Sequence, residues 1–107
     1  MVPTLVTELS NVVVLIGASE RLYETTAQSG MAACGARILS ADLRNATNVA
    51  TEHRPFAIVV GKDTYEFGGP EFDALARDVG AELIVVPDAV QGPLLTTLIA
   101  EAASRLS

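Results

Sequence analysis

The stretch that decides the fold is Phe56–Gly61, with the sequence FAIVVG. It is a short, unbroken apolar run that follows a proline and ends in a glycine. Such a run is typical of a strand buried on both faces, as in the middle of a parallel sheet covered by helices. An open α/β sheet places its ligand site at the carboxyl ends of such strands. The residue at that end is Gly61, which has no side chain to supply chemistry.

Segments with strand and helix patterns alternate on both sides of this run. Further strands are expected at 11–16, 37–41 and 82–86. Helices are expected at 20–34, 46–53, 71–79 and 91–106. Strands that alternate with helices favour right-handed crossovers and a parallel sheet. The sequence therefore predicts an α/β fold, a single three-layer domain over 1–107 with a flavodoxin-like sheet of about four strands in the order 2-1-3-4.

Capping and turn residues mark the ends of these elements. Ser19 is expected to cap the first helix, and Asn45 the second. Residues 61–70 are expected to be the longest irregular stretch, because two glycines and a proline punctuate it. Residues 1–10 have no clear period and are expected to be either a loose lead-in or an extra edge strand.

The composition limits the class of protein. The chain has 107 residues, half of them hydrophobic, and a net charge of −6, so it can bury an aliphatic core without metals or disulfides. The sequence contains no cluster of Lys and Arg, so a nucleic-acid partner is not expected. No apolar run is long enough to span a membrane. A single cysteine cannot form an internal disulfide, which favours a reduced, cytoplasmic setting.

The single cysteine and the single histidine offer little chemistry. Cys34 falls at the end of a predicted helix, where the dipole disfavours a thiolate, so it is expected to be a buried structural thiol. His53 is expected at a helix C-terminus, on the surface. A zinc site is not expected from one residue of each kind, and no cofactor is expected.

Two segments resemble parts of response-regulator receiver domains. RPFAIVVG, at 54–61, is similar to the receiver strand that ends in the phosphorylated Asp, and GAELIVVP, at 80–87, is similar to the last receiver strand. The chain is one βα unit short of a receiver. Gly17 and Ala18 stand where a receiver has the acidic pair that holds magnesium. Gly61 stands at the position of the phosphorylated Asp, and Val86 at the position of the Lys in the receiver's Lys-Pro pair. The resemblance therefore implies a degenerate pseudo-receiver that cannot run the phosphorylation cycle.

Such a domain would act through contact with proteins. The resemblance implies a non-catalytic regulatory or scaffolding module for signal transduction, not an enzyme, which binds another protein. Separately, a sheet of only four strands is expected to leave one edge open, and a helix or strand of a second copy could cover it in a homodimer. The expected contact residues are Tyr65, Phe67 and Phe72, because aromatic side chains on a loop anchor partners. The alternative for these three residues is that they fold back on the rim of the sheet.

A second interpretation gives the strand ends a ligand. The chain would then be a small-molecule or phosphate-metabolite binding domain, or an enzyme subunit, of flavodoxin-like fold. Helix N-terminal amides would hold a small anion together with residues at the strand ends, namely Ser19, Lys62, Asp63 and Asp88. The segment is not a nucleotide-binding P-loop, because Phe56 stands where that motif needs Gly and Asp63 stands where it needs Ser or Thr.

Overall fold

The predicted sheet is present, and its order is β2-β1-β3-β4. The computed structural model describes residues 11–17 and 19–105, so the expectation for residues 1–10 lies outside the described residues. Within the described part, all pairs of neighbouring strands are parallel. The strands are β1 Val12–Ile16, β2 Arg37–Ala41, β3 Ala57–Gly61 and β4 Glu82–Val86. The predicted α/β class and strand order are confirmed.

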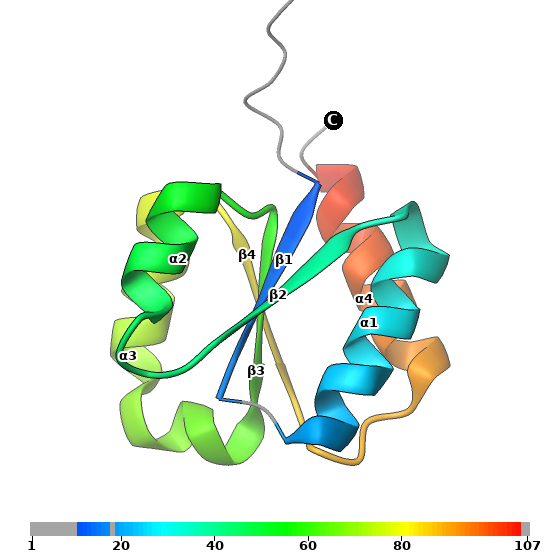
Figure 1. Cartoon of the computed structure of the whole chain (residues 1–107), viewed down its shortest axis with the longest axis horizontal. Coiled ribbons are helices and arrows are strands. Elements are labelled where there is room, and N and C mark those ends of the chain that lie inside the picture. The colour runs from blue at the N-terminus through cyan, green and yellow to red at the C-terminus, as the bar shows by residue number, and fades with distance from the viewer. Residues whose placement is uncertain (1–10, 18, 106–107) are drawn as a thin grey trace, which may run out of the picture.

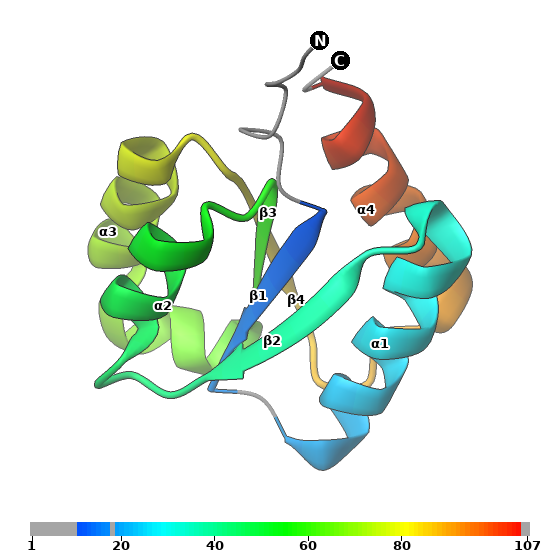
Figure 2. The same ribbon diagram turned by 45° about the horizontal axis from the view of Figure 1, so that its top comes forward.

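Helices cover both faces of the sheet, which gives the three predicted layers. In the described part of the chain they are α1 Glu20–Cys34, α2 Ala46–His53, α3 Lys62–Val79 and α4 Gly92–Arg105. Helices α1 and α4 lie on one face, and α2 and α3 lie on the other (Figure 1, Figure 2). Every strand runs in the same direction, so each helix that follows a strand begins near the carboxyl edge of the sheet.

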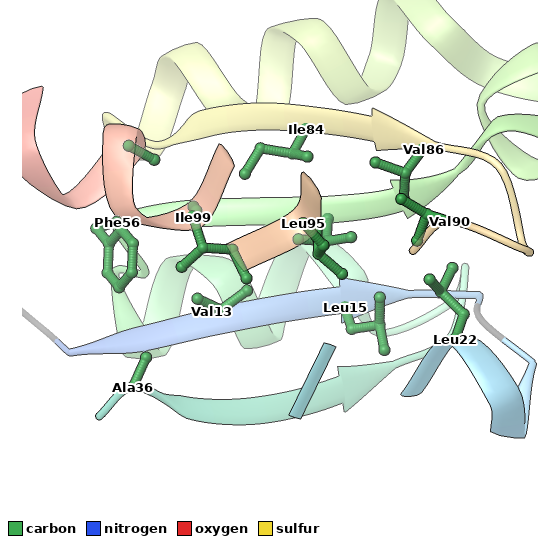
Figure 3. Packing of buried hydrophobic residues seen from close by; sticks show 13 residues of the cluster. Val13, Leu15, Leu22, Ala36, Phe56, Ile84, Val86, Val90, Leu95 and Ile99 are labelled. Atoms are coloured by element: carbon green, nitrogen blue, oxygen red, sulfur yellow. The ribbon is translucent and has the colours of Figure 1, made fainter. Parts of the chain in front are cut away.

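The two central strands are buried from end to end, which explains their unbroken apolar sequences. Side chains alternate between the two faces. Val13 and Leu15 of β1 pack with Leu95 and Ile99 of α4 (Figure 3). Their neighbours on β1 pack with the α2 and α3 side, in a second core cluster. The core therefore lies on both sides of β1 and β3.

Helix α3 begins directly after β3, and the prediction of an irregular stretch at 61–70 is wrong. The backbone leaves helical geometry at Gly68, where φ is −157° and ψ is 40°, and continues through Pro70 as a second helical segment. The kink is packed, because the Tyr65 and Phe72 rings stack with centroids 6.3 Å apart. A Cβ atom on Gly69 would lie 3.0 Å from the Tyr65 ring. The small residues thus allow a kink closed by an aromatic pair.

Three details of the helix ends separate confirmed predictions from wrong ones. Ser19 caps α1, since its Oγ accepts a hydrogen bond from the amide of Leu22. Asn45 makes no side-chain cap bond, because its Oδ1 accepts from the amide of Asp42 inside the turn. Cys34 is exposed, so the prediction of a buried thiol is wrong. The buried side of α1 passes through Leu22, Thr26, Ser29 and Gly30, and the last turn lies beyond it.

Candidate functional site

A cleft opens at the carboxyl edge, between the ends of β1 and β3. The chain passes from β1 through α1 to β2 on one side, and from β3 through α3 to β4 on the other. The loops that follow the two strands therefore separate, and this switch point is where open α/β sheets bind ligands. The cleft measures 330 Å³. It is lined by Gly17, Ser19, Leu22, Gly61, Lys62, Asp63, Thr64 and Asp88.

The structure brings together all four residues that the sequence proposed for a ligand. Ser19 comes from the cap of α1, and Lys62 and Asp63 from the first turn of α3. Asp88 comes from the turn after β4, 69 positions from Ser19. All four side chains line the cleft because parallel strands present their carboxyl ends at one edge. Their role in binding stays a prediction.

Ser19 and Asp88 form the most specific polar contact in the cleft. The Ser19 hydroxyl donates to Oδ1 of Asp88 across 2.5 Å, and its oxygen also accepts from the amide of Leu22 at 3.1 Å. A hydrogen bond to a carboxylate is shorter and stronger than one between neutral groups. The pair therefore ties the start of α1 to the turn after β4, and it places a hydroxyl against a proton acceptor.

Gly17 and Thr64 line the cleft and contact each other. Gly17 has a φ of +60° and donates its amide to the carbonyl of Ala41. The Thr64 hydroxyl donates to the carbonyl of Gly17 at 3.2 Å. A Cβ atom on Gly17 would lie 3.1 Å from Cγ2 of Thr64. A side chain at position 17, as in the receiver pattern, would thus meet both a strained backbone and a close neighbour.

The charges of the cleft are mixed. The N-terminal ends of α1 and α3 meet there, and helix N-termini favour negative charge. Gly61 precedes α3 and offers no capping side chain to its first amides. Lys62, the single lysine of the sequence, adds a cation, and Asp63 and Asp88 add carboxylates. The arrangement suits a ligand that presents an anionic group to Lys62 and hydroxyl groups to the carboxylates.

Leu22 belongs to the cleft, although its place in an apolar helical stripe predicts only a core residue. It is 1% exposed, and its Cδ2 lies 3.6 Å from where a Cβ of Gly61 would be. A Cβ atom at position 61 would thus make an ordinary van der Waals contact with Leu22, which lines the cleft. The sequence does show a glycine at the end of a buried strand, but it does not show that Leu22 lies beside this glycine.

The three aromatic residues expected to bind a partner lie in different environments. Phe72 is buried, and Tyr65 is partly buried and donates its hydroxyl to Asp73 at 3.1 Å. This hydrogen bond raises the pKa of Tyr65 above its ordinary value. Phe67 is 88% exposed. They lie on a kinked helix rather than a loop, so 65 and 72 face inward and only 67 faces outward.

Among residues 11–17 and 19–105, no three side chains of His, Cys, Asp or Glu lie close enough together to hold a metal ion. In the same part of the chain, no helix combines the length and the hydropathy that crossing a membrane requires.

Comparisons with known proteins show the fold more specifically. No protein-family model matches the chain, and no curated protein matches it. A solved structure does match: the lactose-specific IIB component domain of the phosphoenolpyruvate:carbohydrate phosphotransferase system from Streptococcus pneumoniae. The two are 16% identical, the match covers 89% of this chain and 91% of that chain, and the TM-score is 0.50.

This match corrects the receiver interpretation. The chain has the fold of a phosphotransferase-system component, not of a receiver domain, so the pseudo-receiver resemblance is wrong. The expectations of a signal-transduction scaffold and of a chain that is not an enzyme fall with it. The error has a physical origin: an apolar run after a proline and a last strand before a helix are features of many parallel α/β sheets. The fold of this chain is that of the IIB component domain.

Proposed function

We propose that this chain is a small-molecule binding domain that holds a phosphate-bearing, hydroxyl-rich metabolite in the cleft at the carboxyl edge. The observation that carries the proposal is the convergence of Lys62 and two helix N-termini in a cleft that also contains two carboxylates. The position supports it too, because the cleft lies at the topological switch point. A cytoplasmic setting belongs to the same proposal.

Each group has a distinct role in this proposal. Lys62 and the first amides of α3 hold the phosphate, as point charge and as hydrogen-bond donors. Asp63 and the oxygen of Asp88 that does not face Ser19 accept hydrogen bonds from hydroxyl groups. A sugar phosphate combines both features, and the IIB component domain belongs to a carbohydrate phosphotransferase system. The ligand class is therefore tested first with sugar phosphates.

Calorimetric titration with a hexose 6-phosphate, the free hexose and inorganic phosphate tests the proposal. The hexose 6-phosphate is expected to bind most tightly of the three. Lys62→Ala is expected to weaken it by about tenfold or more, since a hydrogen bond to a charged group contributes about 1.5–3 kcal/mol. Arg77→Ala, in the last turn of the same helix, is the matched control and leaves affinity unchanged. An equal loss of affinity in both variants would mean that the effect comes from the overall charge of the chain, and it would refute the site.

A second candidate function, phosphoryl transfer, is favoured by the Ser19–Asp88 pair. A hydroxyl hydrogen-bonded to a carboxylate has the arrangement of a nucleophile and its base. Ser19 Oγ would form a bond to phosphorus, its proton would pass to Asp88, and the donor's phosphorus–oxygen bond would break with the electron pair leaving on the departing group. Cys34 cannot take this role, because it lies at the far end of α1 from the cleft.

Mass spectrometry after incubation with acetyl phosphate or phosphoenolpyruvate tests this second function. One phosphoryl group is expected on Ser19, absent in Ser19→Ala and slower to form in Asp88→Asn. Ser40→Ala, at an exposed serine of β2, is the control and keeps the modification. A chain that stays unmodified with both donors, or one that is modified at another residue, refutes phosphoryl transfer through Ser19 without affecting the binding proposal.

A further inference from the structure

A second hollow lies beside the cleft, between α2 and the kinked start of α3. This groove measures 380 Å³ and is lined by Leu43, Ala46, Thr47, Thr64, Phe67, Gly68, Glu71, Phe72 and Leu75. Two large apolar side chains on its rim are exposed, Phe67 at 88% and Leu43 at 61%. Thr64 lines both the groove and the cleft, so the two share a wall. The hexose phosphate proposed above leaves the groove unused.

The charges of the chain are divided unequally between the two edges of the sheet. Acidic residues predominate where the strands end and the helices begin, at Glu20, Asp42, Asp63, Glu66, Glu71 and Asp88. The basic residues of that edge are fewer, namely Arg21, Arg44 and Lys62. At the opposite edge the arginines balance the acids, with Arg37, Arg54, Arg77 and Arg105 beside Glu52, Asp78, Glu82 and Glu101. Among these residues Glu71 lines the groove, and Asp42, Arg44 and Glu66 stand next to its lining residues in the sequence, so acidic residues outnumber basic ones beside it.

We propose that the groove docks another protein through a basic surface with a protruding apolar side chain. Exposed aromatic residues are typical anchors of protein interfaces, and Phe67 is such a residue on the rim of the groove. Charge decides between the possible occupants. A second copy of this chain would bring its own acidic edge, and like charges placed face to face oppose binding. A basic partner is attracted to the same edge, which raises its association rate.

The kink of α3 fixes the shape of this surface. The Tyr65 ring packs over Gly69 and stacks on Phe72, so the first segment of the helix is held against the second. Phe67 precedes the break at Gly68 and projects from the outer side of the first segment. An unbroken helix would carry this side chain at a different angle. The surface is therefore built by the fold and does not depend on a bound ligand in the cleft.

The test uses two synthetic peptides with alternating leucines, one with lysines between them and one with glutamates. Fluorescence anisotropy gives the affinity, and amide shifts of the ¹⁵N-labelled chain locate the contact. The lysine peptide is expected to bind with shifts at Leu43, Thr47, Phe67 and Glu71, and to weaken as salt rises. Phe67→Ser is expected to weaken it by about tenfold or more. Lys62→Ala, which is expected to weaken ligand binding in the cleft, is not expected to weaken the binding of the lysine peptide.

The matched control is Leu94→Ser, because Leu94 is 55% exposed at the start of α4, outside the groove. This variant is expected to bind the lysine peptide as the unchanged chain does. Equal loss in Leu94→Ser and Phe67→Ser, tight binding of the glutamate peptide, or shifts away from the groove would each overturn the proposal. So would sedimentation showing a dimer that Phe67→Ser dissociates, because the occupant would then be a second copy.

Discussion

At the scale of single residues, Gly17 shows how the backbone defines the cleft. Its φ of +60° and its closeness to Thr64 are separate obstacles to a side chain. Gly35 has only the backbone obstacle, because its φ is +69° but no atom from elsewhere in the chain lies within 4 Å of the place that a Cβ would take. The comparison of these two glycines therefore separates backbone strain from crowding.

Alanine substitutions at the two glycines are expected to differ in effect. Gly35→Ala should lower the free energy of unfolding by about 1–2 kcal/mol, the usual penalty for a left-handed backbone in a residue with a side chain. Gly17→Ala should lower it further, because its Cβ also meets Thr64. Urea unfolding of the two variants measures the difference. If Gly17→Ala is the milder of the two, the contact with Thr64 is not as close as described.

The tyrosine of the α3 kink has a titration that can be followed directly. Asp73 accepts a hydrogen bond from the hydroxyl of Tyr65, which raises the pKa of Tyr65 above its ordinary value of 10.0. In a Tyr23→Phe background, ultraviolet absorbance reports Tyr65 alone. Asp73→Asn is expected to shift its titration to lower pH, because the carboxylate that favours the protonated phenol is gone. An unchanged titration would show that the hydrogen bond does not form in solution.

The same hydrogen bond makes stability depend on pH in one direction. The folded-state pKa of Tyr65 is higher than that of the unfolded chain, so the folded state holds the phenolic proton more tightly. The stabilisation is complete below the unfolded pKa and is lost as the pH rises through the folded pKa. The contribution therefore disappears in the alkaline range, above about pH 10.

At the scale of elements, α4 shows how one helix divides into a buried and an exposed side. Leu95 is 0% exposed and belongs to the core cluster with Val13 and Ile99, whereas its neighbour Leu94 is 55% exposed. Leu95→Ala is expected to lower the free energy of unfolding by about 2–5 kcal/mol, and Leu94→Ala by less than about 0.5 kcal/mol. Thermal or urea unfolding of the pair checks this. Similar losses would mean that α4 is rotated from the described position.

The elements also show what the sequence could and could not predict. β1 and β3 were predictable because a strand buried on both faces needs an unbroken apolar run. The start of α3 was not, because glycines and a proline at 68–70 signal a break, and the stacked rings that hold the kink are a tertiary contact. Local propensity thus indicated an interruption at 68–70, but it could not show that the chain is helical on both sides of it.

At the scale of the whole molecule, topology gathers the site from distant parts of the chain. Ser19, Lys62, Asp63 and Asp88 could be proposed together because parallel strands end at one edge. The hydrogen bond between Ser19 and Asp88 could not be predicted, since it depends on how the turn after β4 faces α1. The specific likeness of the fold to the IIB component domain also could not be predicted, because apolar strand patterns are shared by many α/β proteins.

The central claim is that the cleft is the ligand site, and one measurement tests it most directly. Amide chemical shifts of the ¹⁵N-labelled chain are followed during titration with a hexose 6-phosphate. The account predicts the largest saturable changes at Ser19, Gly61, Lys62 and Asp63, all of which line the cleft. These changes should be lost in Lys62→Ala and kept in Arg77→Ala. No saturable change, or changes centred on another part of the chain, would contradict the claim.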